Sequence, residues 1–167
     1  VGYAWSADGT LVAAVAQIGE NGYVTLAAAI AAAEDGNTVQ LLADSTEDVT
    51  IDKNITLDLG GKTLTNTNAG KATISVDNGV TATAKNGSVV GGTSFYNIQV
   101  GKAVNSTANL TLENVTATAG NTGSSMIDNW GTLTIESGDY EGGLNVVKSE
   151  EGSTLTINGG KFTLNHA

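Results

Sequence analysis

A short strand-like motif recurs along the last two-thirds of the chain, and it restricts the fold more than any other feature. Its copies begin 25, 28, 23 and 22 residues apart. They are Leu57-Asp58-Leu59, Ala82-Thr83-Ala84, Leu110-Thr111-Leu112, Leu133-Thr134-Ile135 and Leu155-Thr156-Ile157. A period of this length with alternating short strands is typical of a solenoid in which each repeat is one coil.

Each copy leads into a turn and then into a second apolar position. The turn positions are Gly61, Asn86, Asn114, Ser137 and Gly159, and the apolar positions after them are Leu64, Val89, Ala117, Tyr140 and Phe162. Gly, Asn and Ser tolerate tightly turned backbone. A third apolar stretch, such as Ile74-Ser75-Val76, lies between copies. Three strands per repeat predict a triangular coil, and therefore an all-β parallel β-helix of five to six coils over residues 37–167.

The N-terminal segment has a different pattern. Leu26, Ala29, Ile30 and Ala33 recur at helical spacing, Thr25 can cap the start, and Gly36 can end the helix. A solenoid needs a cover at its open end, so we predict that residues 1–36 form an N-terminal strand, over 11–18, and an amphipathic capping helix, continuous with the β-helix. Tyr3 and Trp5 are expected to pack at that end.

The region around this junction resembles a known family. The stretches that carry the resemblance are Tyr23 to Leu26, Ala31 to Val39 and Val49 to Leu64. They look like the pectate-lyase-like right-handed parallel β-helix modules of secreted and wall-attached bacterial surface proteins, over roughly residues 23 to 163. The resemblance implies that the β-helix is right-handed and that the protein is extracellular. It does not imply an activity, because this fold carries many functions.

Composition excludes several functions. The chain has no Cys, Pro or Arg, and its seven basic residues face seventeen acidic ones, which gives a net charge of −10. This charge disfavours nucleic acids and anionic membranes as partners. Because no apolar run approaches the roughly 20 residues of a membrane span, we expect no membrane insertion.

The sequence predicts a protein without catalysis, metal or cofactor. The lyases of the family resemble one another in using several Asp residues for Ca²⁺ and a basic residue, commonly Arg, whereas the outward column of this chain offers only Asp58 beside four Thr residues. A polygalacturonase-like site needs neighbouring Asp residues and a His, and His166 is the only His. We expect His166 to be a spectator.

Glu113 and Glu136 form one carboxylate pair that needs separate consideration. They follow the motif on adjacent coils, so their backbones are expected about 4.8 Å apart. This separation resembles that of the two carboxyls of a retaining glycosidase, and it could also hold a cation. The alternative is an exposed corner column in which Lys85 pairs weakly with Glu113. We favour the exposed column because a corner lacks walls that exclude solvent.

Two exposed features could bind ligands. Phe95 and Trp130 are aromatic residues outside the predicted core and could stack on sugar rings, whereas alternation with Ile98 and Val100 predicts that Tyr96 faces inward. An outward array of Thr-x-Thr pairs resembles the ice-binding faces of some β-solenoids, although Asp58 and Asn109 interrupt it. Thr is also a favoured outward residue in ordinary strands.

Taken as a whole, the sequence predicts a secreted or cell-surface stalk or adhesin module that presents loops to glycan or protein ligands. The longer loop around Val100 to Thr107 is one such candidate. A phage or virion fibre module, a fragment of a carbohydrate-active enzyme and an ice-binding protein are the alternatives. The last coil, around Leu155, Ile157 and Phe162, has no evident cover, so we expect self-association or a neighbouring domain there.

Overall fold

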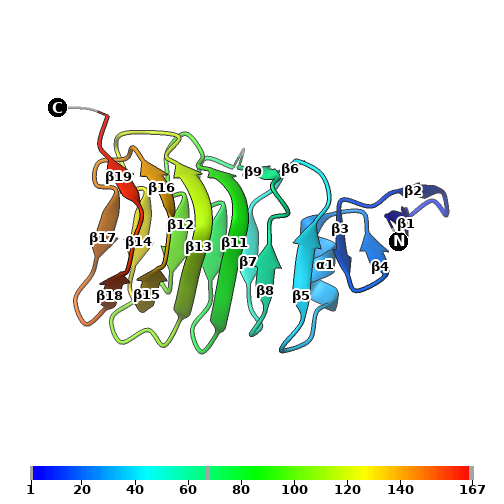
Figure 1. The fold of residues 1–167 in the computed structure, drawn as a ribbon, viewed down its shortest axis with the longest axis horizontal. Coiled ribbons are helices and arrows are strands. Elements are labelled where there is room, and N and C mark those ends of the chain that lie inside the picture. The colour runs from blue at the N-terminus through cyan, green and yellow to red at the C-terminus, as the bar shows by residue number, and fades with distance from the viewer. Residues whose placement is uncertain (1, 67, 166–167) are drawn as a thin grey trace.

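The computed structural model, which describes residues 2–66 and 68–165, is a β-solenoid of about five turns with a short helix near its N-terminal end (Figure 1). Its elements are β1 (Tyr3–Trp5), β2 (Leu11–Ala13), β3 (Ala16–Ile18), β4 (Asn21–Tyr23), α1 (Leu26–Ala32), β5 (Thr38–Leu41), β6 (Ser45–Thr46), β7 (Val49–Ile51), β8 (Thr56–Asp58), β9 (Thr63–Thr65), β10 (Ile74–Val76), β11 (Thr81–Val90), β12 (Ile98–Val100), β13 (Asn109–Thr118), β14 (Ile127–Asn129), β15 (Thr132–Ile135), β16 (Gly138–Glu141), β17 (Val147–Ser149), β18 (Thr154–Ile157) and β19 (Lys161–Thr163). The predicted all-β solenoid is confirmed.

Parallel strands stack into three sheets along the solenoid. The first sheet contains β5, β8, the first halves of β11 and β13, β15 and β18. The second contains β6, β9, the second halves of β11 and β13, β16 and β19. The third contains β7, β10, β12, β14 and β17. Strands β11 and β13 turn the corner between the first two sheets at Asn86 and Asn114, whose φ angles of 59° and 53° lie in the left-handed region.

The core is a set of buried columns, each built from partner residues on successive coils. The first sheet contributes Val39, Leu57, Ala84, Leu112 and Ile135, and beside them Ala82, Leu110 and Leu133. The second sheet contributes Leu64, Val89, Ala117 and Tyr140, and the third contributes Val49, Ile74, Ile98 and Ile127. A buried aliphatic side chain contributes roughly 1.5–3 kcal/mol, so a single coil cannot offset its backbone entropy and the stack is required.

The predicted register between the first two motif copies is wrong by two residues. The structure pairs Leu57 with Ala84 and Asp58 with Lys85, rather than with Ala82 and Thr83. Beyond the corner, Leu64 pairs with Val89 as predicted. The coil that contains β8 and β9 therefore carries two extra residues at its corner, where Gly60 and Gly61 both have positive φ. Because the shift is an even number, each side chain keeps its predicted face.

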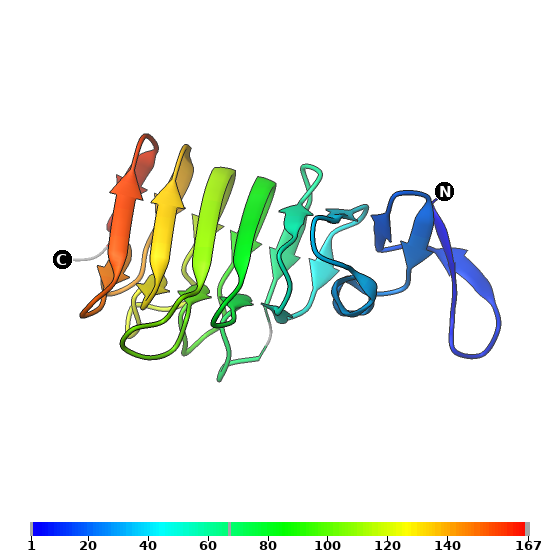
Figure 2. The same ribbon diagram turned by 90° about the horizontal axis from the view of Figure 1, so that it is seen from below.

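The N-terminal cap is more complex than one strand and one helix. The predicted strand over residues 11–18 divides into β2, which pairs with β1, and β3, which pairs antiparallel with both β4 and β5. The prediction that Tyr3 and Trp5 pack at this end is wrong: their side chains are 62% and 71% exposed. Both belong to the β1–β2 hairpin, which projects from the stack at the N-terminal end (Figures 1 and 2).

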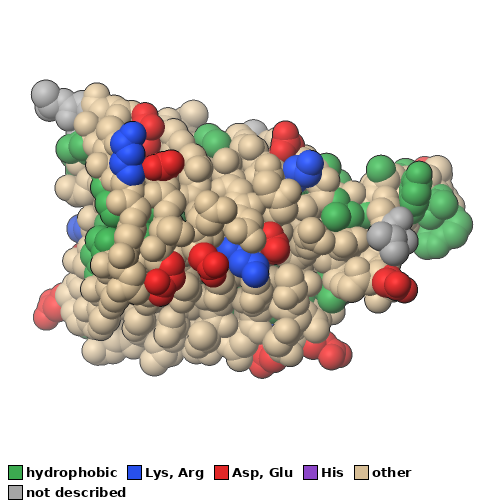
Figure 3. Space-filling view, viewed as in Figure 1, with side chains coloured by type: hydrophobic (Ala, Val, Ile, Leu, Met, Phe, Trp, Pro, Cys, Tyr) green, Lys and Arg blue, Asp and Glu red, His purple; other side chains and the backbone are tan. Residues whose placement is uncertain are grey.

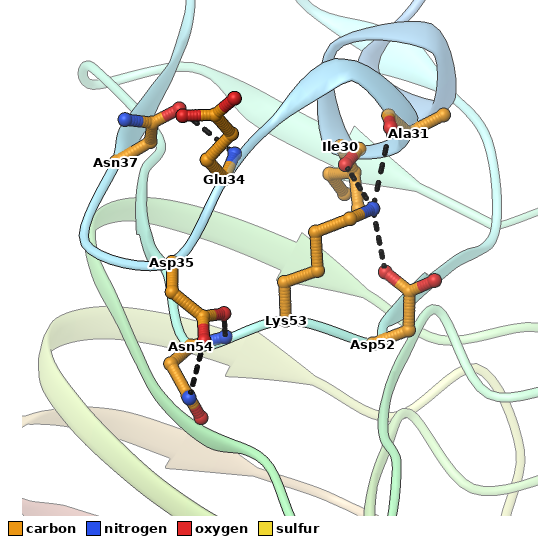
Figure 4. A network of polar contacts seen from close by, with 8 residues as sticks. All are labelled: Ile30, Ala31, Glu34, Asp35, Asn37, Asp52, Lys53 and Asn54. Atoms are coloured by element: carbon orange, nitrogen blue, oxygen red, sulfur yellow. Dashed lines mark hydrogen bonds and ion pairs between the residues drawn. The ribbon is translucent and has the colours of Figure 1, made fainter.

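Side chains of the first coil hold both ends of α1. Thr25 caps the start as predicted, because its Oγ1 accepts a hydrogen bond from the Ala28 amide at 3.0 Å. The Glu47 carboxylate accepts from the amides of Leu26 and Ala27 at 2.9 and 3.1 Å. At the other end Lys53 Nζ donates to the carbonyls of Ile30 and Ala31 at 3.1 and 3.2 Å (Figure 4). The helix stops at Ala32, short of Gly36.

The C-terminal end of the stack leaves apolar side chains exposed. Leu155 and Ile157 of β18 and Phe162 of β19 continue the core columns, yet they are 36%, 48% and 36% exposed. The ring of Phe162 stacks on Tyr140 of the preceding coil, with centroids 5.2 Å apart. Within the described residues no further coil covers this end (Figure 2).

Candidate ligand-binding site

The outward face of the third sheet carries a column of polar residues. Register partners on successive strands place Thr50, Ser75, Gln99, Asp128 and Lys148 in this column. An outward column normally faces water, but Ser75 and Gln99 are each only 8% exposed and Asp128 is fully buried. Flanking loops therefore cover the middle of this sheet and turn its outer face into a recessed surface.

One hollow lies on this column, and we call it the sheet groove. It has a volume of about 380 Å³. Its lining residues are Asp48, Thr50, Gly70, Lys71, Ala72, Ser75, Phe95, Gln99 and Lys102. Thr50, Ser75 and Gln99 supply uncharged hydrogen-bonding groups, and Phe95 supplies an aromatic surface. The charges at its edge are paired, with Lys71 3.7 Å from Asp48 and Lys102 3.7 Å from Asp77.

A second hollow, the corner pocket, adjoins the sheet groove at Lys102, which lines both. Its volume is about 430 Å³, and the loop from Gly101 to Ser106 forms much of its wall. Asn78 Oδ1 anchors this loop by accepting hydrogen bonds from the amide and hydroxyl of Thr107 and from Ser106 Oγ. Gly101 has a φ of 69°, and a Cβ there would lie 2.1 Å from Ser106 Oγ. The long loop predicted between Val100 and Thr107 thus borders a pocket.

Asp128 lies at the centre of a polar network beside the sheet groove. Its Oδ2 accepts a hydrogen bond from Gln99 Nε2 at 3.0 Å and another from Trp130 Nε1 at 2.9 Å. Its Oδ1 is buried and has no donor among the described residues. The carboxyl of Glu150 lies within hydrogen-bonding range of Asp128, and Lys148 Nζ is 2.5 Å from Glu150 Oε1. We call Asp128, Glu150 and Lys148 the carboxyl cluster.

This environment shifts several proton affinities. Burial raises the pKa of Asp128, hydrogen bonds from Gln99 and Trp130 oppose the rise, and the Glu150 carboxyl adds to it. Burial also raises the pKa of the neighbouring Tyr96 hydroxyl, and the charge of Asp128 contributes. The hydrogen bond to Glu150 raises the pKa of Lys148. The neutral form of Asp128 is therefore favoured more than in an ordinary aspartic acid.

Both aromatic residues predicted to bind ligands lie beside this column. Phe95 is half-buried and lines the sheet groove, while Trp130 is half-buried and bonds to Asp128. The prediction for Tyr96 is wrong: it is half-buried beside Phe95, with ring centroids 4.7 Å apart, and lies outside the core. β12 begins only at Ile98, so the alternation does not extend back to Tyr96. Asn97 is buried instead, and its amide bonds to the carbonyls of Val89 and Thr118.

Glu113 and Glu136 occupy adjacent coils, as predicted, because Leu112 pairs with Ile135 just before them. Both are exposed, and neither lines the hollows described above. The Glu136 carboxylate accepts from Asn158 Nδ2 at 3.1 and 3.0 Å. Lys85 is the register partner of Glu113, as expected for the corner column. Both carboxylates therefore lie on an open corner of the solenoid, in contact with solvent.

The corrected register changes the Thr array on the first sheet. Thr38, Thr56, Thr83, Thr111, Thr134 and Thr156 are successive register partners in one unbroken column. Asp58 therefore does not interrupt it, whereas Asn109 keeps its predicted place in the neighbouring column with Thr81, Thr132 and Thr154. Figure 3 shows this part of the surface as mostly uncharged, with one row of charged side chains crossing the view.

The sequence signal for Gln99 and Asp128 was weak. Gln99 lies between Ile98 and Val100, and Asp128 lies between Ile127 and Asn129, which predicts the outward face for both but not burial. Loops from neighbouring coils cause that burial. His166 lies outside the described residues.

Among the described residues, no cluster of three or more His, Cys, Asp or Glu side chains is placed to hold a metal ion. No helix among these residues has the length and apolarity to cross a membrane. No family model, curated protein or solved structure matches the chain.

Proposed function

We propose that the chain is a non-catalytic binding module of a secreted or cell-surface protein, and that it binds a glycan in the sheet groove. The observation that carries this proposal is the groove itself, with the uncharged polar residues Thr50, Ser75 and Gln99 beside the ring of Phe95. Hydroxyl and amide groups match the hydroxyls of a sugar, and an aromatic ring matches its apolar face.

The arrangement of charge favours a neutral glycan over an acidic one. Lys71 and Lys102 at the groove already pair with Asp48 and Asp77, and the whole chain has a net charge of −10. A polyanion would have to compete with these aspartates and overcome the overall repulsion. The rigid backbone of the solenoid would keep the groove in shape before binding, which reduces the entropic cost.

A glycan array, followed by calorimetry on the strongest ligand and a native-mass measurement, tests this proposal. We expect Phe95→Ala to weaken binding at least tenfold, which corresponds to about 1.4 kcal/mol. Tyr3→Ala is the matched control, because Tyr3 is an exposed aromatic residue on the distant β1–β2 hairpin. Absence of any bound glycan, or equal affinity in wild type and Phe95→Ala, would contradict the proposal. Capture of a protein ligand instead would favour an adhesin module that binds protein.

We also expect no catalysis on uronic-acid polymers. The chain has no Arg or Cys, and Asp128 is shielded from substrate by burial. Incubation with polygalacturonate, with and without Ca²⁺, should release no unsaturated products, as followed by ultraviolet absorbance. Product release that is abolished by Glu113→Gln or Glu136→Gln would overturn this expectation.

A second candidate function is ice binding by the first sheet, and the unbroken column of six Thr residues favours it. Adjacent strands of the stack place their Thr hydroxyls about 4.8 Å apart. This regular array could match the surface of an ice crystal. Thr111→Tyr would interrupt this array and should abolish thermal hysteresis. Thr116→Tyr, on the second sheet, is the control. No hysteresis in the wild-type chain would eliminate this candidate.

A further inference from the structure

The carboxyl cluster contains an apparent conflict between two acids. Asp128 is fully buried, Glu150 lies within hydrogen-bonding range of it, and Asp128 Oδ1 has no donor among the described residues. Two ionised carboxylates in this position would repel each other, and Asp128 would be a buried charge without a cation of its own. A single proton between the two carboxyls removes both problems, because it neutralises one acid and supplies the missing donor.

The surroundings indicate which acid carries the proton. Lys148 Nζ is 2.5 Å from the Glu150 carboxylate, so Glu150 has a cation to stabilise its charge. Asp128 has two neutral donors, Gln99 and Trp130, and both bond to the same oxygen, Oδ2. The other titratable group near Asp128 is the Tyr96 hydroxyl, which is neutral at ordinary pH. The proton therefore belongs on Asp128 Oδ1, where it donates to Glu150.

We infer that Asp128 is a positioning residue for the sheet groove: it shares one proton with Glu150, and this shared proton sets the positions of Gln99 and Trp130. The chain of contacts runs from Lys148 through Glu150 and Asp128 to Gln99, which lines the groove. Loss of the proton to water leaves the carboxylates of Asp128 and Glu150 both negatively charged, so that they repel each other. Glu150 directly follows the edge strand β17 and would move away from Asp128.

This inference deepens the proposed function and rests on it in one respect only, namely that a ligand occupies the sheet groove. The ionised carboxylate of Asp128 accepts a stronger hydrogen bond from Gln99 than the neutral acid does, so Gln99 would present its amide to the ligand in a more fixed orientation after the proton is lost. Glycan affinity should accordingly be lower at acidic pH than above the titration of Asp128. The state of the carboxyl cluster can be measured without any ligand.

The test is a pH titration of the ligand-free chain by NMR, with ¹⁵N spectra of the Trp130 indole and the Gln99 side-chain amide. The chain has two Trp residues, so Trp5→Phe leaves Trp130 as the sole indole signal. We expect both resonances to titrate together, with one midpoint above 3.8, the ordinary pKa of Asp. Asp128→Asn should abolish this common titration, and Glu150→Gln should move its midpoint.

The control is Asp139→Asn, which removes an exposed carboxyl on β16 and should leave both resonances unchanged. Independent titration of the two resonances, a midpoint at or below 3.8, or persistence of the titration in Asp128→Asn would overturn the inference. A glycan array without hits would contradict the proposed function but not the shared proton. Conversely, a glycan that binds with the same affinity in wild type and Asp128→Asn across the titration would overturn the positioning role alone.

Discussion

At the scale of single residues, the alternation of the first sheet separates buried from outward side chains. Leu133 is fully buried between Leu110 and Leu155, whereas Thr134 points to the outer face and is only half-buried. We predict that Leu133→Ala lowers the free energy of unfolding by roughly 2–5 kcal/mol, because it leaves a cavity in a core column.

Thr134→Ala should cost under about 1 kcal/mol, since it removes an outward hydroxyl and methyl group and leaves no cavity. Urea denaturation of the two variants provides the measurement. Similar losses in both variants would mean that the two faces of the strand are wrongly assigned.

Asp128 should give the chain an unusual dependence of stability on pH. Because burial raises its pKa, the folded state holds this proton more tightly than the unfolded chain does. The contribution of Asp128 to the free energy of unfolding is therefore complete below pH 3.8 and is lost as the pH rises through the raised value. Asp128→Asn should remove this loss, so that the variant gains stability relative to wild type towards neutral pH. Thermal denaturation at several pH values checks the prediction; a variant that loses stability equally at all pH values contradicts it.

At the scale of elements, the cap depends on side chains contributed by the first coil. Glu47 satisfies the amides of Leu26 and Ala27 at the start of α1, where backbone donors have no partner inside the helix. We predict that Glu47→Ala lowers the free energy of unfolding by about 1–2 kcal/mol, comparable to the loss of a helix cap. Amide hydrogen exchange at Leu26 and Ala27 should accelerate.

Glu20→Ala is the control for this prediction, because Glu20 is exposed in the turn between β3 and β4. Unchanged exchange at Leu26 and Ala27 in Glu47→Ala would show that the Glu47 contacts do not hold the start of the helix.

The sequence predicts the strands and the helix well where the periodicity of apolar residues is strong. It predicts the structure less well where contacts made by loops determine it. The motif copies, the corner positions and the Thr25 cap were all predicted, because each depends on local spacing or turn chemistry. The two-residue error at Gly60 and Gly61 arose because a motif match does not reveal an insertion at a corner. Burial of Asp128 and the position of Tyr96 depend on contacts between different coils, which a single repeat does not encode.

At the scale of the whole molecule, the two ends of the solenoid differ. The β3–β4 hairpin and α1 cover the N-terminal end, and the buried residues Leu26, Ala29 and Ile30 close the core there. The exposed side chains of Leu155, Ile157 and Phe162 mark the C-terminal end. Exposed apolar side chains next to unpaired strand edges favour association.

We predict that the isolated chain self-associates through the C-terminal end at high concentration. Phe162→Asp should lower the average mass measured by light scattering, because it places a charge on this surface. Thr116→Asp, an exposed position on the second sheet, serves as the control. A strictly monomeric wild-type chain, unchanged by Phe162→Asp, would show that this end needs no partner.

The strict pairing of Asn109 with Thr132 also sets how such a chain can change in length. One period here is 23 residues, from Asn109 to Gly131, and its removal would bring Thr132 next to Thr81 with all inward and outward faces preserved. Duplication of the same segment would lengthen the stack by the same increment, about 4.8 Å. The solenoid can therefore serve as a molecular ruler, whose reach evolves in whole steps while the spacing of its surface groups stays constant.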